Sequence, residues 1–164
     1  MTKNEAVFTK DVTNRTLTIV RPFNASLAKV WDAWTKSEIL DQWWAPKPYR
    51  AGTVEMDFRE GGHWRYYMEG PEGEKHYCQC NYHTIAPRQF YTATDMFCDE
   101  QGNPNTEFPS MDWKVSFAEA DVQTTVTTVI TFARIEDMEA IVKMGFEEGF
   151  TMGLGNLDEV LLAL

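Results

Sequence analysis

The 164-residue sequence has no apolar run near the roughly 20 residues that a membrane-spanning helix needs. Its N-terminal segment also lacks an apolar core of signal-peptide length, so we expect a cytoplasmic protein. Clusters of lysine and arginine are missing too, and the formal net charge is −10. Because binding to phosphate groups needs clustered basic side chains, the sequence argues against nucleic acid and anionic membrane surfaces as partners.

Cysteine and histidine are scarce, with three residues of each. Cys78, Cys80 and Cys98 form no C-x-x-C pair, so we expect free thiols. Strand alternation places His76 and His83 on opposite faces, which disfavours a three-histidine metal site. The motifs G-x-S-x-G and H-E-x-x-H and a P-loop are missing as well. We therefore expect no metal and no cofactor, and a melting temperature that chelators leave unchanged.

Aromatic residues, in contrast, make up 13% of the chain, which suffices for a core and favours an apolar cavity. Strong helical periodicity occurs between residues 137 and 164. The apolar positions of this pattern are Phe146, Phe150, Leu154, Leu157, Leu161 and Leu164. A neighbouring stripe of Gly145, Gly149 and Gly153 costs about 1 kcal/mol per glycine in a helix interior. The stripe indicates either close approach to another backbone or space for a ligand between helix and sheet.

In the rest of the chain, the spacing of apolar residues predicts mainly strands. Period-two alternation predicts strands over residues 14–23, 54–58, 64–68, 75–85, 88–97, 113–117 and 126–132. Two short helices are expected between residues 24 and 44, where Trp31 and Trp34 lie on an apolar face. Residues 1–13 form a polar N-terminal lead. The pattern predicts a single α+β domain over residues 1–164, with an antiparallel sheet of about seven strands.

Alternation also predicts which strand faces point toward the C-terminal helix. These faces carry Val54, Met56 and Phe58; Trp64, Tyr66 and Met68; and Trp113, Val115 and Phe117.

Three segments carry a resemblance to a known family: VWDAWTKSEILDQWWAPK at Val30–Lys47, VEMDFREGGHWRYYMEGPEG at Val54–Gly73, and FEEGF with NLDEVL between Phe146 and Leu162. From Thr16 onward the chain resembles the START-like, or SRPBCC, superfamily of the birch-pollen-allergen type. Within it, the motifs are similar to the subfamily named for the C-terminal domain of the activator of the heat-shock-protein-90 ATPase. The resemblance implies a helix-grip fold, in which a curved sheet and a long C-terminal helix enclose an apolar cavity.

Three functions remain open. The favoured one is non-enzymatic binding of an apolar or amphipathic small molecule in this cavity. The expected ligand-binding residues are Trp64, Tyr66, His76, Cys80, Tyr82, Phe117, Phe146, Gly149, Phe150 and Gly153. The second is a chaperone-regulating or stress-response module, which would show an exposed apolar patch and a tightly filled interior. The third, an enzyme resembling the superfamily's cyclases and dehydratases, needs an acid/base pair in the cavity, for which His76 and Asp95 are the candidates.

Overall fold

The computed structural model describes residues 4–164, which form an eight-stranded antiparallel sheet and four helices. The strands are β1 (Val7–Asp11), β2 (Thr16–Phe23), β3 (Arg50–Asp57), β4 (His63–Glu69), β5 (Lys75–Ala86), β6 (Phe90–Cys98), β7 (Met111–Ala120) and β8 (Gln123–Thr131). The helices are α1 (Leu27–Thr35), α2 (Ser37–Trp43), α3 (Ile135–Lys143) and α4 (Phe146–Ala163). Along the sheet the strands follow the order β1-β2-β8-β7-β6-β5-β4-β3.

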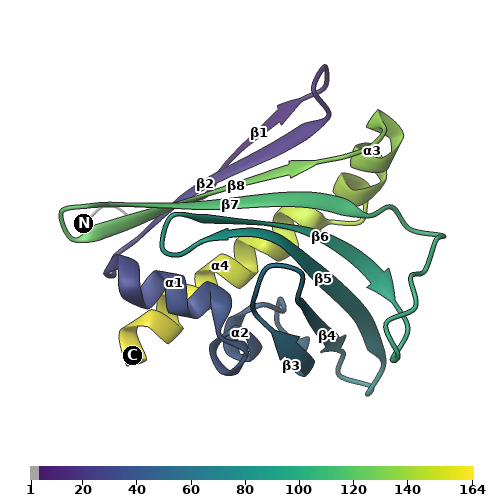
Figure 1. Cartoon of the computed structure of the whole chain (residues 1–164), viewed down its shortest axis with the longest axis horizontal. Coiled ribbons are helices and arrows are strands. Elements are labelled where there is room, and N and C mark those ends of the chain that lie inside the picture. Colours follow the sequence, from purple (N-terminus) through teal and green to yellow (C-terminus); the bar gives the residue numbers. More distant parts are fainter. Residues whose placement is uncertain (1–3) are drawn as a thin grey trace.

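The sheet curves around helix α4, which crosses its concave face (Figure 1). Helices α1 and α2 pack against α4 and close one end of this arrangement (Figure 1). The architecture confirms the expected α+β class and the helix-grip fold, with two short helices after the strand that begins at Thr16.

The two short helices form where the sequence predicts them. Ser26 caps α1, because its side-chain oxygen accepts a hydrogen bond from the backbone N–H of Lys29 at 3.3 Å. Lys36 has an extended backbone, with φ −107° and ψ 125°, and this residue separates α1 from α2. Trp34 and Trp43 are each 1% exposed and meet edge to face, with ring centroids 4.9 Å apart. The helices therefore cover the core with aromatic side chains.

Strand alternation correctly predicts the inward faces of β4 and β7, but not all of β3. Trp64 and Tyr66 are buried, as are Trp113, Val115 and Phe117. On β3, the register against β4 shifts between Thr53 and Glu55. This bulge leaves Val54 45% exposed, whereas Met56, opposite Trp64, packs against the core again. The prediction for Val54 is wrong because a bulge inserts one residue and interrupts the period of two.

Part of the predicted polar lead is structured. Residues Val7–Asp11 form β1 and pair with β2, from Val20 back to Thr16, which raises the number of strands from about seven to eight. Three of the five residues in β1 are exposed, so the segment has almost no apolar alternation that would identify it. As an edge strand, it is held chiefly by backbone hydrogen bonds to β2. Residues 1–3 of the predicted lead lie outside the described part of the chain.

The C-terminal segment with helical periodicity forms two helices, α3 and α4, and not the single long helix that was predicted. Gly145 lies between α3 and α4 with φ 90°, a left-handed conformation that ends a helix and that glycine adopts without strain. Gly145 is thus a helix-terminating residue, whereas Gly149 and Gly153 lie inside α4. The long helix that the sheet surrounds is the 18-residue α4.

Candidate functional site: an apolar cavity between the sheet and the C-terminal helix

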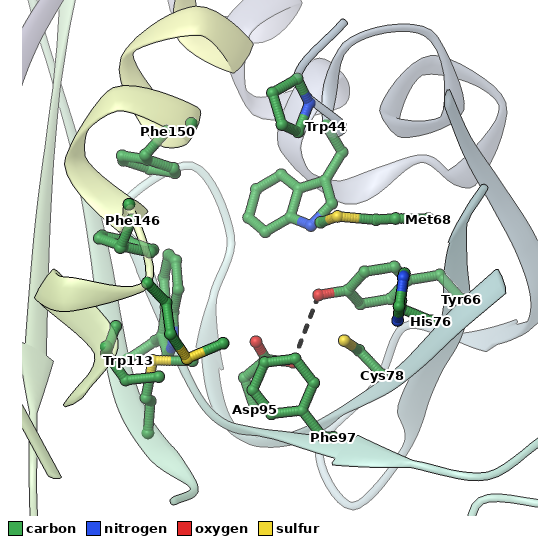
Figure 2. Close-up of a pocket in the computed structure, with 16 residues that line it drawn as sticks. Trp44, Tyr66, Met68, His76, Cys78, Asp95, Phe97, Trp113, Phe146 and Phe150 are labelled. Atoms are coloured by element: carbon green, nitrogen blue, oxygen red, sulfur yellow. Dashed lines mark hydrogen bonds between the residues drawn. The ribbon is translucent and has the colours of Figure 1, made fainter. Parts of the chain in front are cut away.

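A cavity of about 230 Å³ lies between the concave face of the sheet and the first turns of α4 (Figure 2). Its lining combines residues from β4 to β7 with the end of α2, the end of α3 and the start of α4. The lining residues are Trp44, Pro46, Tyr66, Met68, His76, Cys78, Asp95, Phe97, Met111, Trp113, Ile141, Met144, Gly145, Phe146, Gly149 and Phe150. The wall is therefore mainly aromatic and aliphatic, with a small number of polar groups.

The register of the sheet explains why these side chains converge. Trp64 lies opposite Cys80, Cys80 opposite Asp95, and Asp95 opposite Met111, across four successive strands. Cross-strand partners in an antiparallel sheet point to the same face. Asp95 is consequently placed in the middle of the concave face, among apolar neighbours.

Asp95 is the buried acid of the cavity. It is 8% exposed, and the Tyr66 hydroxyl donates to its Oδ1 over a long distance of 3.5 Å (Figure 2). Burial raises the pKa of the Asp95 carboxyl to about 7, while hydrogen bonds from Tyr66 and from the backbone N–H of Met96 only partly oppose this rise. Near neutral pH the carboxyl can therefore either hold or release a proton.

The thiols of Cys78, which lines the cavity, and of Cys80, the cross-strand partner of Asp95, have different chemistry from this acid. Burial raises the pKa of Cys78 and of Cys80 above the ordinary thiol value, and the carboxylate of Asp95 adds to the effect. Since the thiolate is the nucleophilic form, neither cysteine is activated for covalent chemistry.

The structure brings together most of the predicted ligand-binding residues, in two adjoining spaces. Tyr66, His76, Phe146, Gly149 and Phe150 line the 230 Å³ cavity. Trp64, Cys80 and Tyr82 line a void of about 20 Å³ that also borders Tyr66 and Asp95.

The two glycines predicted to face a ligand have different environments. A Cβ atom on Gly149 would meet Pro46 Cγ at 3.7 Å, an ordinary contact, and the residue borders the cavity. A Cβ atom on Gly153 would lie 3.3 Å and 3.4 Å from the carbonyl oxygens of Trp43 and Trp44. Gly153 therefore lets α4 approach the end of α2, and only Gly149 leaves space at the cavity.

Phe117 lies away from the cavity, although its strand face was predicted correctly. Its ring packs edge to face against Trp31, at 5.0 Å between centroids, and against Trp34 at 6.2 Å. It is part of the core beneath α1.

The three histidines do not converge. His76 lies on the concave side and is an exposed part of the cavity lining. His63 contacts Glu55 at 2.5 Å, and His83 contacts Thr94 at 2.7 Å. Neither of these two histidines lines the cavity. His76 and Asp95 both line the cavity, but among residues 4–164 no hydrogen bond links their side chains.

Several lining residues were not predicted from the sequence. Strand alternation placed Met68 on the inward face with Tyr66, but Met68 was not among the expected ligand-binding residues; Phe97 extends the inward face that includes Asp95, so the same alternation could have identified it. Trp44 lies just beyond the last residue of α2, where its side chain reaches the cavity wall, while the neighbouring Trp43 remains in the core.

The curved sheet, the gripped helix and the cavity between them define a START-like, or SRPBCC, helix-grip protein. Residues 24–162 match the family described as Activator of Hsp90 ATPase homolog 1-like protein, and the chain belongs to this family. No curated protein matches the sequence. Among the helices of residues 4–164, none has the length and apolar character required to cross a membrane.

Solved structures of similar proteins agree with this assignment. Protein Ms6760 from Mycobacterium smegmatis is 30% identical, with a TM-score of 0.87, over 95% of this chain and 96% of that chain. A protein from Arthrobacter aurescens is 31% identical, with a TM-score of 0.90, over 96% of this chain and 92% of that chain. A Staphylococcus epidermidis protein is 26% identical, with a TM-score of 0.84, over 96% and 94% of the two chains.

Proposed function

We propose that this protein binds an apolar or amphipathic small molecule in the cavity between the sheet and α4, without catalysing a reaction on it. The observation that carries the proposal is the 230 Å³ cavity, which has an aromatic wall and a single buried carboxyl group. Protein interiors are close-packed and contain few voids larger than one water molecule. A space of this size is therefore better explained as a ligand site than as a packing defect.

The composition of the wall supports an apolar ligand body with at least one polar group. Aromatic and aliphatic surfaces favour a ligand through the hydrophobic effect, at about 25 cal/mol per Å² of apolar area removed from water. Tyr66 and Asp95 supply the polar contacts that would orient it (Figure 2). The volume is below the usual range of about 300–1,000 Å³ for drug-sized ligands, so we expect a small molecule.

Two observations favour binding over the alternatives. A chaperone-regulating module was expected to have a tightly filled interior, and the cavity argues against that expectation. An enzyme would need a positioned acid/base pair, but His76 is an exposed part of the cavity lining and does not bond to Asp95.

Binding can be tested with native mass spectrometry and a fluorescent neutral probe, 1-naphthylmethanol. Native mass spectra of the purified protein should show a co-purifying small molecule, and the ligand-stripped protein should bind the probe. Gly149→Leu should weaken probe binding at least tenfold, because the new side chain enters the cavity. The matched control is Gly155→Leu on the same helix, where a Cβ atom meets nothing within 4 Å. This control should change affinity less than twofold.

Two results would contradict the proposal. If the wild-type protein carries no small molecule and binds no probe, the cavity has no binding function. If Gly149→Leu is folded and binds the probe as tightly as Gly155→Leu, binding takes place elsewhere on the protein.

A further inference from the structure

We infer that the natural ligand carries a protonated amine, which pairs with the Asp95 carboxylate inside a surround of aromatic side chains. The inference rests on the proposed binding function and specifies the chemical class of the ligand. Three features of the cavity support it: the carboxyl group without a charged partner, the aromatic wall, and the lack of cationic groups around the acid.

Asp95 is more than nine-tenths buried, yet it takes part in none of the ion pairs formed within residues 4–164. Its side chain accepts a long hydrogen bond from Tyr66, at 3.5 Å, and the backbone N–H of Met96 also donates to it, but neither donor carries a charge. A buried carboxylate is normally paired or well hydrogen-bonded, because isolated burial of a charge is costly. The carboxyl group also borders the cavity, so a ligand can supply the missing partner.

The wall facing Asp95 is suited to a cation. Phe146 and Phe150 stack at 5.3 Å on α4, and Trp113 and Trp44 meet them edge to face at 6.2 Å each. Phe146 and Phe150 lie across the open space from the Tyr66–Asp95 pair, whereas Trp44 lies on the side of Tyr66, with ring centroids 6.3 Å apart (Figure 2). Aromatic faces attract Lys-like or ligand ammonium groups through the ring quadrupole, most strongly where water is excluded.

Among the titratable side chains around Asp95, His76 alone is of a type that can carry a positive charge, and it is exposed. Those that line the two spaces near Asp95 are Tyr66, His76, Cys78, Cys80, Tyr82 and Tyr91. The tyrosines and cysteines are neutral or, when ionised, negative, and His76 is the exposed one. Residues from β7, α3 and α4 contribute no titratable side chain to the cavity lining. The net charge of −10 further favours the approach of cations over anions.

An ammonium group on the ligand would stabilise the ionised form of Asp95 and so offset the effect of burial. The carboxyl has a pKa of about 7 in the protein alone, so binding of an amine below that pH must displace its proton. Amine affinity should therefore fall as pH decreases from 8 to 5, by up to about tenfold per pH unit below 7. A neutral ligand of the same shape should show no such dependence.

The test uses three probes of one shape: 1-naphthylmethylamine, 1-naphthylmethanol and 1-naphthoic acid, titrated by fluorescence at pH 8. Wild-type protein should bind the amine at least tenfold more tightly than the alcohol, and the acid most weakly. Asp95→Asn should bring the amine-to-alcohol affinity ratio close to one. Tyr66→Phe serves as the comparison variant. It keeps the carboxylate, so the preference for the amine should persist.

The outcomes separate this inference from the proposed function. If the alcohol or the acid binds as tightly as the amine, the amine inference is wrong and the binding function stands. An amine preference that persists in Asp95→Asn would also overturn the inference. If the wild-type protein binds none of the three probes and carries no small molecule, both proposals fail. Should Asp95→Asn not fold, the amine-to-alcohol ratio in wild-type protein decides, because a ratio that is constant from pH 8 to pH 5 contradicts the inference.

Discussion

Arg21 on β2 and Asp158 on α4 join the sheet to the gripped helix through two hydrogen bonds, 3.1 Å from Nη1 to Oδ1 and 2.5 Å from Nη2 to Oδ2. Arg21 is 5% exposed, and its guanidinium also donates to the Pro22 carbonyl oxygen at 2.7 Å. The Asp158 side chain lies at the boundary between the core and solvent, where it reaches the buried arginine. This pair fixes the C-terminal half of α4 on the concave face.

Removing the carboxylate should leave a buried, unpaired guanidinium. We expect Asp158→Ala to lower the free energy of unfolding by about 1–3 kcal/mol, less than for a fully buried pair because the Asp158 side chain is 41% exposed. The control is Glu159→Ala on the same helix, which breaks an exposed pair with Lys47 at 3.6 Å. Its effect should stay within about 0.5 kcal/mol. Urea denaturation at pH 7 measures the free energy of unfolding of both variants. Equal losses of stability would show that burial of Arg21 does not increase the cost of removing its partner.

Gly153 should tolerate substitution poorly for a different reason. The carbonyl oxygens of Trp43 and Trp44 lie close to where a Cβ atom would stand, and Asn156 donates to the Ala45 carbonyl oxygen at 3.1 Å. That hydrogen bond keeps α4 near the end of α2, so the helix cannot easily move away from a new side chain.

We expect Gly153→Leu to destabilise the protein by about 1–3 kcal/mol through overpacking. Gly155→Leu, at an open position of the same helix, should instead stabilise it by up to about 1 kcal/mol, because leucine has the higher helix propensity. Denaturant midpoints of the two variants provide the comparison. Similar midpoints would mean that the approach of α4 to α2 does not require glycine.

The fold was largely predictable because alternation and helical period report which side of an element is buried. Trp64 and Tyr66 were assigned to the concave face from spacing alone, and the structure confirms this. Val54 was misassigned because a bulge depends on hydrogen-bond register, which spacing does not reveal. The break at Gly145 was missed for a similar reason, since apolar positions continue with helical spacing on both sides of it.

The candidate site was less predictable, because a cavity is a property of packing between elements. Periodicity places Phe117 and Phe146 on inward faces equally well, but only the packed structure separates a core ring from one that borders the cavity. Trp43 and Trp44 are adjacent and identical in type, yet Trp44, just beyond the last residue of α2, borders the cavity and Trp43 does not. Asp95 was considered as one half of an acid/base pair with His76; its environment depends on neighbours from three other strands.

The buried carboxyl of Asp95 gives a pH dependence of stability whose sign follows from its pKa. In the unfolded chain an aspartate titrates near its ordinary pKa of about 3.9, whereas burial raises the pKa of Asp95 to about 7 in the folded protein. Between these values the folded protein binds one more proton than the unfolded chain. The Asp95 contribution to stability is therefore fully present below about pH 4, and is lost as pH rises to about 7.

Asp95→Asn tests this linkage, because asparagine stays neutral at every pH. The free energy of unfolding of the variant minus that of wild-type protein should increase from pH 4 to pH 7, at about 1.4 kcal/mol per pH unit at most, and level off above pH 7. Subtracting the wild-type value cancels the titration of all other groups. Glu139→Gln, at an exposed position of α3, is the control for removing a negative charge, and its difference from wild-type protein should vary much less. Urea denaturation of ligand-free protein at pH 4, 5, 6, 7 and 8 gives the curves. A constant difference for Asp95→Asn would mean that Asp95 is ionised in the folded protein throughout this range, because another group compensates its charge.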